Sequence, residues 1–233
     1  YRLVVEDKIK SRKPHHKAES IPSSMPAKQV DTLQLLPLVG RGDALTQMAQ
    51  LYQCVQHEAD KQVICIEGEA GIGKTRLIET FVAGVQTQLP HFIIHCYESE
   101  SDLAYAPLIR ALRNALANSA WLEHMTVPWL SELVRLLPEI TTQRTDIVYE
   151  PIADNIAAQS RLLEAIAQAL DTVVTSTNPI VLIIEDLQWV DKATLDFLSY
   201  YLRRTSRQPK LHILTWRDMK NDVTDYRQRV LAE

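Results

Sequence analysis

The stretch IEGEAGIGKTRLIE, residues 66–79, constrains the possible folds of this chain more than any other segment. It contains glycine, lysine and threonine at the spacing G-x-x-x-x-G-K-[ST] of a phosphate-binding loop, and the four positions are Gly68, Gly73, Lys74 and Thr75. Glycines allow backbone N–H groups to turn toward phosphates, and a following helix adds the positive end of its dipole. The alternative interpretation is a glycine turn that binds no nucleotide.

The residues on both sides of this loop have the hydrophobic patterns that such a site requires. VICIE at 63–67 is short, apolar and β-branched, as expected of a strand, and residues 76–89 carry apolar side chains at helical spacing. The apolar helix positions are Leu77, Ile78, Phe81, Val82, Val85 and Leu89. In a strand–loop–helix unit of this kind, Lys74 would reach the β- and γ-phosphates and the Thr75 hydroxyl would join the shell of a Mg²⁺ ion.

A second chemical motif is IVLIIEDLQWVD, residues 180–191. Strand ends in open α/β sheets face the ligand crevice, and a carboxylate there can hold a metal ion. Of Glu185 and Asp186, one would hold Mg²⁺ or its water and the other would orient or deprotonate the attacking water. Alternatively, the two acids only cap the next helix. Asp191 is placed to be the N-cap of a helix over 192–206.

A third motif is LHILTWRD, residues 211–218, in which Arg217 directly follows a β-like run. Such a position would put a fixed cation at the carboxyl edge of the sheet, within reach of a γ-phosphate. Thr215 offers a polar contact of the same kind. The alternative for Arg217 is an ordinary surface ion pair.

Predicted strands and helices alternate along the chain, which indicates an α/β fold with a mainly parallel sheet covered on both faces. Between residues 105 and 176 the pattern is helical and is divided by Pro128, Pro138 and Pro151. With 46% hydrophobic residues, the 233-residue chain can bury a core. The strands are expected at 63–67, 91–98, 180–184 and 211–215, and helices at 43–56, 76–89 and 192–206.

Charge and cysteine content exclude several classes of protein. A net charge of −4 argues against a whole-surface nucleic-acid binder and against an acidic disordered chain. The widely separated Cys54, Cys65 and Cys96 are expected to be reduced and buried, rather than paired or bound to metal. Neither a signal peptide nor a membrane-length apolar run is present, so we expect a cytoplasmic protein without a membrane partner.

Residues 1–36 differ from the rest and predict a linker or the tail of a preceding domain. They are rich in proline and serine, and the chain begins without methionine, so we expect a fragment. The basic residues are expected to form a solvated tether, with nucleic-acid binding as the alternative. These residues are Lys8, Lys10, Arg12, Lys13 and Lys17.

Taken together, these motifs resemble the STAND branch of the AAA-related P-loop ATPases, in particular the ATPase domain of large bacterial transcriptional activators of the LuxR type and the BTAD-containing type. The resemblance covers about residues 37–218. It is specific for the ATPase module and not for the attached effector, since related modules accompany nucleotide cyclases and protein kinases. Its motifs are LVGR at 38–41, GEAGIGKTRL at 68–77, VLIIEDLQWVDKATLDFL at 181–198 and LHILTWRD at 211–218.

The resemblance implies a P-loop three-layer sandwich and a set of site residues. Gly42 stands where the family often has an acid, and Glu185 precedes Asp186 where the family has Asp first, so the division of roles between those two acids stays open. The implied catalytic residues are Lys74, Glu185, Asp186 and Arg217, with Arg217 as the sensor of the γ-phosphate, and the implied metal ligands are Thr75 and Glu185. The implied cofactor-binding residues are Val39, Gly40 and Arg41 near the adenine, and Gly68, Ala70, Gly71, Ile72, Gly73, Lys74, Thr75 and Arg76 around the phosphates.

By the same resemblance, residues 37–233 form an ATPase core that stops before the lid and the last strand, so hydrolysis would be slow or absent in this fragment. The implied cofactors are ATP or ADP with Mg²⁺. The implied partners are the adenine nucleotide, further copies of the full-length protein in its ATP state, and DNA only through an effector domain outside this fragment.

We expect a nucleotide switch, because the sequence contains no second phosphate-transfer site, no helicase-like channel and no substrate-pocket signature. Four alternatives stay open. They are a P-loop kinase, a module that keeps ADP as a structural cofactor, direct DNA binding by the basic N-terminus, and an ATPase module attached to a cyclase or protein kinase.

Overall fold

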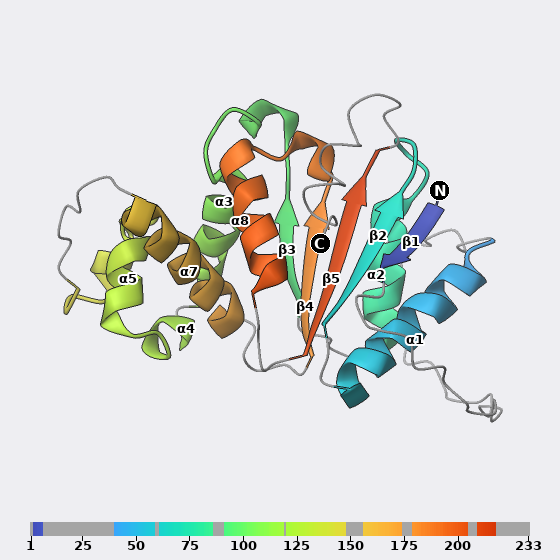
Figure 1. Ribbon diagram of the computed structural model, residues 1–233, viewed down its shortest axis with the longest axis horizontal. Coiled ribbons are helices and arrows are strands. Elements are labelled where there is room, and N and C mark those ends of the chain that lie inside the picture. The colour runs from blue at the N-terminus through green and yellow to red at the C-terminus, as the bar shows by residue number, and fades with distance from the viewer. Residues whose placement is uncertain are drawn as a thin grey trace.

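A five-stranded sheet forms the centre of the fold in the computed structural model (Figure 1), with the strand order β1-β2-β5-β4-β3. β2, β5, β4 and β3 run parallel, and β1 pairs antiparallel with β2 at one edge. The strands are β1 Arg2–Glu6, β2 Lys61–Glu67, β3 His91–His95, β4 Ile180–Glu185 and β5 Lys210–Trp216. The structure describes residues 2–6, 40–58, 61–85, 91–118, 120–147, 156–173, 179–204 and 209–217.

The register of the parallel strands aligns their carboxyl ends. Glu67 at the end of β2 is opposite Trp216 at the end of β5, and His95 of β3 is opposite Glu185 of β4. Each of these strands therefore leads into its next loop at the same edge of the sheet. This carboxyl edge is where open α/β sheets bind ligands.

Helices cover both faces because successive strand side chains point to opposite sides. On β2, Ile64 and Ile66 pack into one hydrophobic cluster with α1 (Gly42–Glu58) and α2 (Lys74–Val85). Val63 and Cys65 belong to the other cluster, which includes α3 (Ala106–Ala115), α7 (Ile156–Val173) and α8 (Lys192–Arg203). The result is an α/β sandwich of three layers with a mainly parallel sheet, as expected.

A small group of helices lies beyond α7 at the end of the molecule away from β1 (Figure 1). It consists of α4 (Ala120–Glu123), α5 (Val127–Leu133) and α6 (Ile140–Gln143). Pro128 lies in the first turn of α5, where a missing N–H is tolerated, and Pro138 lies between α5 and α6. The predicted division of the helical region at these prolines is confirmed, whereas Pro151 lies outside the described residues.

Three expectations about local structure need correction. The strand expected at 91–98 ends at His95, because its pairing partner β4 ends at Glu185; Cys96 then donates its N–H to the Glu185 carbonyl (3.0 Å) and a 3-10 helix follows over Glu98–Glu100. The helix expected to reach residue 206 ends at Arg203. All three cysteines are free, as predicted, but Cys54 is exposed on α1.

Two further observations concern the ends of the sheet and the surface. The short edge strand β1 was not predicted from the sequence, which indicated a linker or a preceding domain there. The rest of the proposed linker, residues 7–36, lies outside the described residues. Within the part of the chain that the structure describes, no helix is long and apolar enough to cross a membrane.

Candidate nucleotide-binding site

The glycine-rich loop connects β2 to α2 and needs its glycines for backbone conformation. Gly71 and Gly73 have φ angles of 74° and 89°, in the left-handed region that most residues avoid. A Cβ atom at Gly71 would meet no atom within 4 Å, so space is not the constraint there. The loop leads into the first turn of α2, whose N–H groups have no acceptor within the helix. Such a turn can bind phosphate oxygens.

Lys74, the first residue of α2, lies over this loop with only 8% of its surface exposed. Its Nζ donates to the carbonyls of Gly68 (2.8 Å) and Glu69 (3.0 Å). Burial lowers its pKa, the charges of Asp186 and Glu185 raise it, and that of Arg217 lowers it. Hydrogen bonds join Gly68 to Trp216 and Asp186 to Thr215, so the structure places the four predicted catalytic residues at the same edge of the sheet.

The other predicted loop residues surround this lysine. Ala70, Gly71 and Thr75 are exposed, whereas Ile72 and Arg76 are half-buried. An exposed hydroxyl at Thr75, next to the lysine, is accessible to a metal ion bound with a nucleotide. The loop and the start of α2 therefore combine exposed backbone with the Lys74 ammonium and the exposed residue Thr75.

Arg41, immediately before α1, contacts the backbone of the loop. Its Nη1 donates to the carbonyl of Gly73 (3.0 Å) and its Nη2 donates to the carbonyl of Ile72. Gly40 has a φ of 76° and turns the chain into the helix. Val39 lies outside the described residues. The predicted contact of these residues with adenine stays a prediction, and the observed role of Arg41 is to hold the loop against α1.

Glu185 ends β4 and is almost buried, with 7% of the residue exposed. Its Oε2 lies 2.9 Å from Nδ1 of His95, the residue opposite it on β3. This contact engages one carboxylate oxygen and leaves Oε1 for another partner. His95 was not singled out from the sequence, since only the register of β3 against β4 places it beside the acid.

Asp186 leaves the course of the strand. Its φ of 56° and ψ of 48° are left-handed, a conformation that Asp tolerates better than most residues. Its N–H donates to Oγ1 of Thr215 on β5 (3.0 Å), and its Oδ1 accepts from Nε2 of Gln188 (3.0 Å). This turn directs the carboxylate differently from that of Glu185, so the two acids are not equivalent.

Arg217 follows β5, and its surroundings join the third motif to the other two. Its N–H donates to Oε1 of Gln188 (3.0 Å), and its guanidinium carbon lies 5.9 Å from the centre of the Trp189 ring. The N–H of Gly68 donates to the carbonyl of Trp216, with a separation of 3.4 Å. The end of β5 is therefore connected both to the glycine loop and to the segment after β4.

Asp191 is the N-cap of α8, as predicted, because its Oδ1 accepts from the N–H of Thr194 (2.9 Å). The same oxygen accepts from the N–H of Tyr105 (2.9 Å), which has a left-handed backbone at the start of α3. Asp191 thus fixes two helix starts and is separate from the acidic pair.

The donor set fits Mg²⁺ bound together with phosphate. Within the described ranges, no group of three or more His, Cys, Asp or Glu side chains could hold a metal ion unaided. Mg²⁺ in nucleotide sites is held by one or two protein oxygens together with phosphates and water. Thr75 and Glu185 supply oxygens of that kind.

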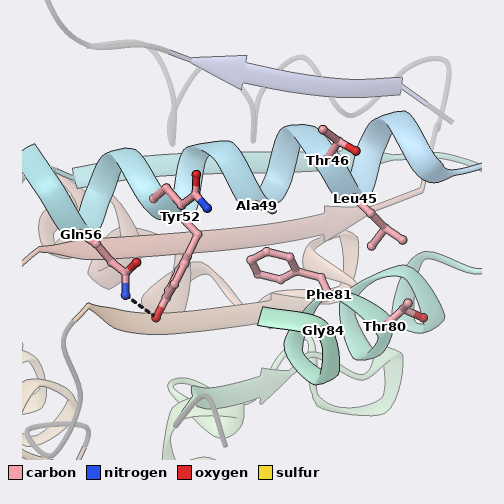
Figure 2. Close-up of a pocket in the computed structure, with 9 residues that line it drawn as sticks. Leu45, Thr46, Ala49, Tyr52, Gln56, Thr80, Phe81 and Gly84 are labelled. Atoms are coloured by element: carbon pink, nitrogen blue, oxygen red, sulfur yellow. Dashed lines mark hydrogen bonds between the residues drawn. The ribbon is translucent and has the colours of Figure 1, made fainter. Parts of the chain in front are cut away.

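A groove of about 490 Å³ lies between α1 and α2, on the side of these helices away from the sheet (Figure 2). Tyr52 and Phe81 meet edge to face in it, with ring centres 6.3 Å apart. Gln56 donates to the Tyr52 hydroxyl (3.1 Å), and burial raises the pKa of Tyr52. Among the residues that the structure describes, those lining this groove carry no charge, in contrast to the edge of the sheet at the glycine loop.

This combination of glycine loop, buried lysine, acid-ended strand and arginine-ended strand defines a P-loop nucleotide-binding domain. The family model described as the AAA ATPase domain matches residues 37–215, and the chain belongs to this family. Membership implies binding of a nucleotide with Mg²⁺. The match covers the whole region from Gly40 to Thr215 that carries the site, with Arg217 just beyond it.

Individual relatives are distant. An uncharacterised protein of Rhizobium meliloti (strain 1021) is 26% identical over 196 residues, which cover 78% of this chain and 18% of that protein. The chain thus spans less than a fifth of the length of this relative.

Among solved structures, Cdc6p from Pyrobaculum aerophilum is similar, with a TM-score of 0.46, 12% identity, and coverage of 86% of this chain and 46% of that one. The structure of Drosophila ORC bound to GC-rich DNA and Cdc6 is also similar, with a TM-score of 0.37, 17% identity, and coverage of 82% and 53%. At these scores neither likeness carries the assignment, which rests on the family match and on the site itself.

Proposed function

We propose that this chain is the ATP-binding and slowly hydrolysing core of a nucleotide switch in a signal-transducing transcriptional regulator. The observation that carries the proposal is the hydrogen-bond network that holds the loop under Lys74, the end of β5 before Arg217 and the segment of Asp186 together at one edge of the sheet. Lys74 begins α2, Glu185 ends β4 with Asp186 directly after it, and Arg217 follows β5. A triphosphate with Mg²⁺ is complementary to this arrangement of charges.

In binding, the N–H groups of the loop and of the first turn of α2 donate hydrogen bonds to the phosphate oxygens. Lys74 supplies positive charge at the β- and γ-phosphates after exchanging its carbonyl partners, Gly68 and Glu69, for phosphate oxygens. Thr75 and Glu185 would hold Mg²⁺, which neutralises charge on the phosphates when bound. His95 holds one oxygen of Glu185, so the other is directed to this task.

In hydrolysis, Asp186 orients a water molecule and accepts its proton. The water oxygen forms a bond to the γ-phosphorus, the bond from that phosphorus to the β–γ bridging oxygen breaks, and ADP leaves with the electron pair. The hydrogen bond from Gln188 and the turn at Asp186 fix the direction of the carboxylate. General-base assistance of this kind is worth about 10²–10⁴-fold in rate.

In switching, Arg217 supplies the difference between ATP and ADP. A ligand shifts a conformational equilibrium only through contacts that differ between two states, and the γ-phosphate is such a contact. The regulator context is supported by the resemblance of the motifs to bacterial transcriptional activators. Self-association in the ATP state and DNA binding through a separate effector domain belong to the full-length protein in this proposal.

The test is calorimetric titration of ATP, ADP and GTP with Mg²⁺, with phosphate release followed in parallel. Glu185→Gln should weaken Mg²⁺-dependent binding, whereas Asp186→Asn should keep binding and lower turnover about 10²–10⁴-fold. Asp196→Asn is the matched control, because this acid is half-exposed on α8 and forms an ion pair with Lys192 one turn earlier in the same helix. If neither site variant changed binding or turnover, the two acids would be helix caps and the proposal would fail. Sedimentation of the full-length protein with ATP and with ADP would test self-association.

A further inference from the structure

Gln188 lies between two of the charged groups of the site and contacts both. Its Nε2 donates to Oδ1 of Asp186 (3.0 Å), and its Oε1 accepts from the backbone N–H of Arg217 (3.0 Å). Gln188 belongs to the 3-10 helix Leu187–Trp189, which follows β4, whereas Arg217 follows β5. One side chain thus connects the ends of two neighbouring strands.

The chemistry of the two partners fixes the orientation of this amide. A carboxylate only accepts hydrogen bonds and a backbone N–H only donates them. Turning the amide around would place its oxygen against the Asp186 carboxylate and its NH₂ group against the N–H of Arg217. Only the observed orientation satisfies both partners, and a flip of the amide would break both hydrogen bonds at once.

A second hydrogen bond joins the ends of the same two strands, with the side-chain acceptor now on β5 and the backbone donor after β4. Thr215 of β5 accepts through Oγ1 from the N–H of Asp186 (3.0 Å), while Gln188 accepts from the N–H of Arg217. Each strand end is therefore held by a side chain from the other. The backbone of Asp186 and the direction of its carboxylate both depend on this pair of bridges.

We propose that Gln188 is a positioning residue that ties the Asp186 carboxylate to the backbone of Arg217, so that the acid and the cation respond together to a γ-phosphate. The inference rests on the proposed function and adds the regulation of that site. Displacement of Arg217 moves its N–H relative to Gln188, and the amide then carries the displacement to the carboxylate. Outer contacts of this kind typically change activity by about 10–100-fold when they are removed.

Two substitutions separate the parts of the link. Gln188→Met keeps the length and volume of the side chain but removes both hydrogen bonds. Gln188→Glu keeps the acceptor for Arg217 and replaces the donor by an oxygen that faces the Asp186 carboxylate, which adds like-charge repulsion. Gln53→Met on α1 is the control, because Gln53 is an exposed glutamine in the groove between α1 and α2.

The experiment measures kcat, KM, the Kd values for Mg²⁺-ATP and Mg²⁺-ADP, and Tm for the wild type and the three variants. We expect Gln188→Met to lower kcat about 10–100-fold with the ADP Kd unchanged, Gln188→Glu to lower kcat at least as much, and Gln53→Met to match the wild type. Both Gln188 variants should also lose part of the preference for ATP over ADP.

The inference is overturned if Gln188→Met leaves kcat and the ATP preference unchanged. It is also overturned if a lower kcat comes with a lower Tm and weaker ADP binding, because Gln188 would then be merely structural. If the wild type binds ATP without turnover, the ratio of the ATP and ADP Kd values is the readout, and an unchanged ratio in Gln188→Met overturns the inference. A wild type that binds no nucleotide overturns the proposed function together with this inference, so the two failures are distinguishable.

Discussion

Charged residues lie at both ends of the parallel strands, the carboxyl edge and the amino edge of the sheet, but their partners differ. At the carboxyl edge, Lys74 donates to two backbone carbonyls, and its charge interacts with two acids and an arginine that are held separately. At the amino edge, where β5 begins, the charges of α7, α8 and β5 are paired directly with one another.

Asp171 of α7 is the centre of this amino-edge cluster. It accepts hydrogen bonds from the hydroxyl of Tyr201 (2.6 Å), from Nη1 of Arg204 (2.6 Å) and from Nζ of Lys210 (2.5 Å). The Lys210 side chain is only 2% exposed, and burial lowers its pKa while Asp171 raises it. Arg204 extends the cluster to Glu164 of α7 through two further hydrogen bonds.

The two clusters differ in what an added anionic ligand would have to displace. In the amino-edge cluster each ion already has an opposite ion at contact distance, so an added ligand would have to displace one. At the carboxyl edge the lysine is held by neutral carbonyls, which a phosphate can replace at a net electrostatic gain. Burial alone does not distinguish a site from a scaffold, but the nature of the partner does.

The largest effect should follow from breaking the amino-edge cluster. Asp171→Asn removes the negative charge and leaves Lys210 buried without its ion-pair partner, which should lower the free energy of unfolding by ~3–5 kcal/mol in chemical denaturation. Asp196→Asn, an exposed pair with Lys192, should change it by ~0.3–0.5 kcal/mol. Equal effects in the two variants would refute the distinction between the clusters.

A smaller effect, in binding rather than stability, should follow at the other edge. Lys74→Ala should weaken Mg²⁺-ATP binding about 10–100-fold, because hydrogen bonds to charged groups contribute about 1.5–3 kcal/mol. Calorimetric titration measures it, with Lys192→Ala as the control, since that lysine is 80% exposed on α8. An unchanged ATP affinity in Lys74→Ala would remove the loop from the binding site.

The smallest effect concerns His212 of β5, which lies near the amino-edge cluster without being ion-paired in it. Burial lowers its pKa from 6.5 to about 3, and the charges of Lys210 and Lys61 act in the same direction. Between these pH values the unfolded chain binds a proton that the folded chain does not, so stability falls as the pH falls below 6.5.

The expected loss from this histidine approaches about 1.4 kcal/mol per pH unit, and unfolding curves between pH 6.5 and 5.5 would show it. His212→Phe keeps a ring beside Tyr201 and should flatten the pH dependence, whereas His57→Gln, at an exposed position of α1, should not. A slope unaffected by His212→Phe would mean that other groups cause the acid sensitivity.

Much of the fold and the carboxyl-edge site could be predicted from the sequence, because their signals are local. The loop motif lies in one short segment, from Gly68 to Thr75. The apolar strand that ends at Glu185 and Asp186 is likewise recognisable from its own residues, without knowledge of its neighbours in the sheet. The sheet order places these local units side by side at the carboxyl edge.

What could not be predicted depends on residues that are distant in sequence. His95 meets Glu185 only through strand register, and Gln188 meets Arg217 only because β4 and β5 are neighbours. The amino-edge contacts of Asp171 span 30 to 39 residues and leave no local pattern. The short strand β1 has too few residues to show its pairing with β2 in advance.

The left-handed backbone at Asp186 has a consequence for the range of side chains that this position can accept. A β-branched or bulky residue would strain the turn by roughly 1–2 kcal/mol in addition to removing the carboxylate, whereas Asn or Gly would fit the turn and remove only the charge. A saturation library at position 186 should therefore divide into variants that lose the carboxylate but fold normally and variants that lose it and fold poorly.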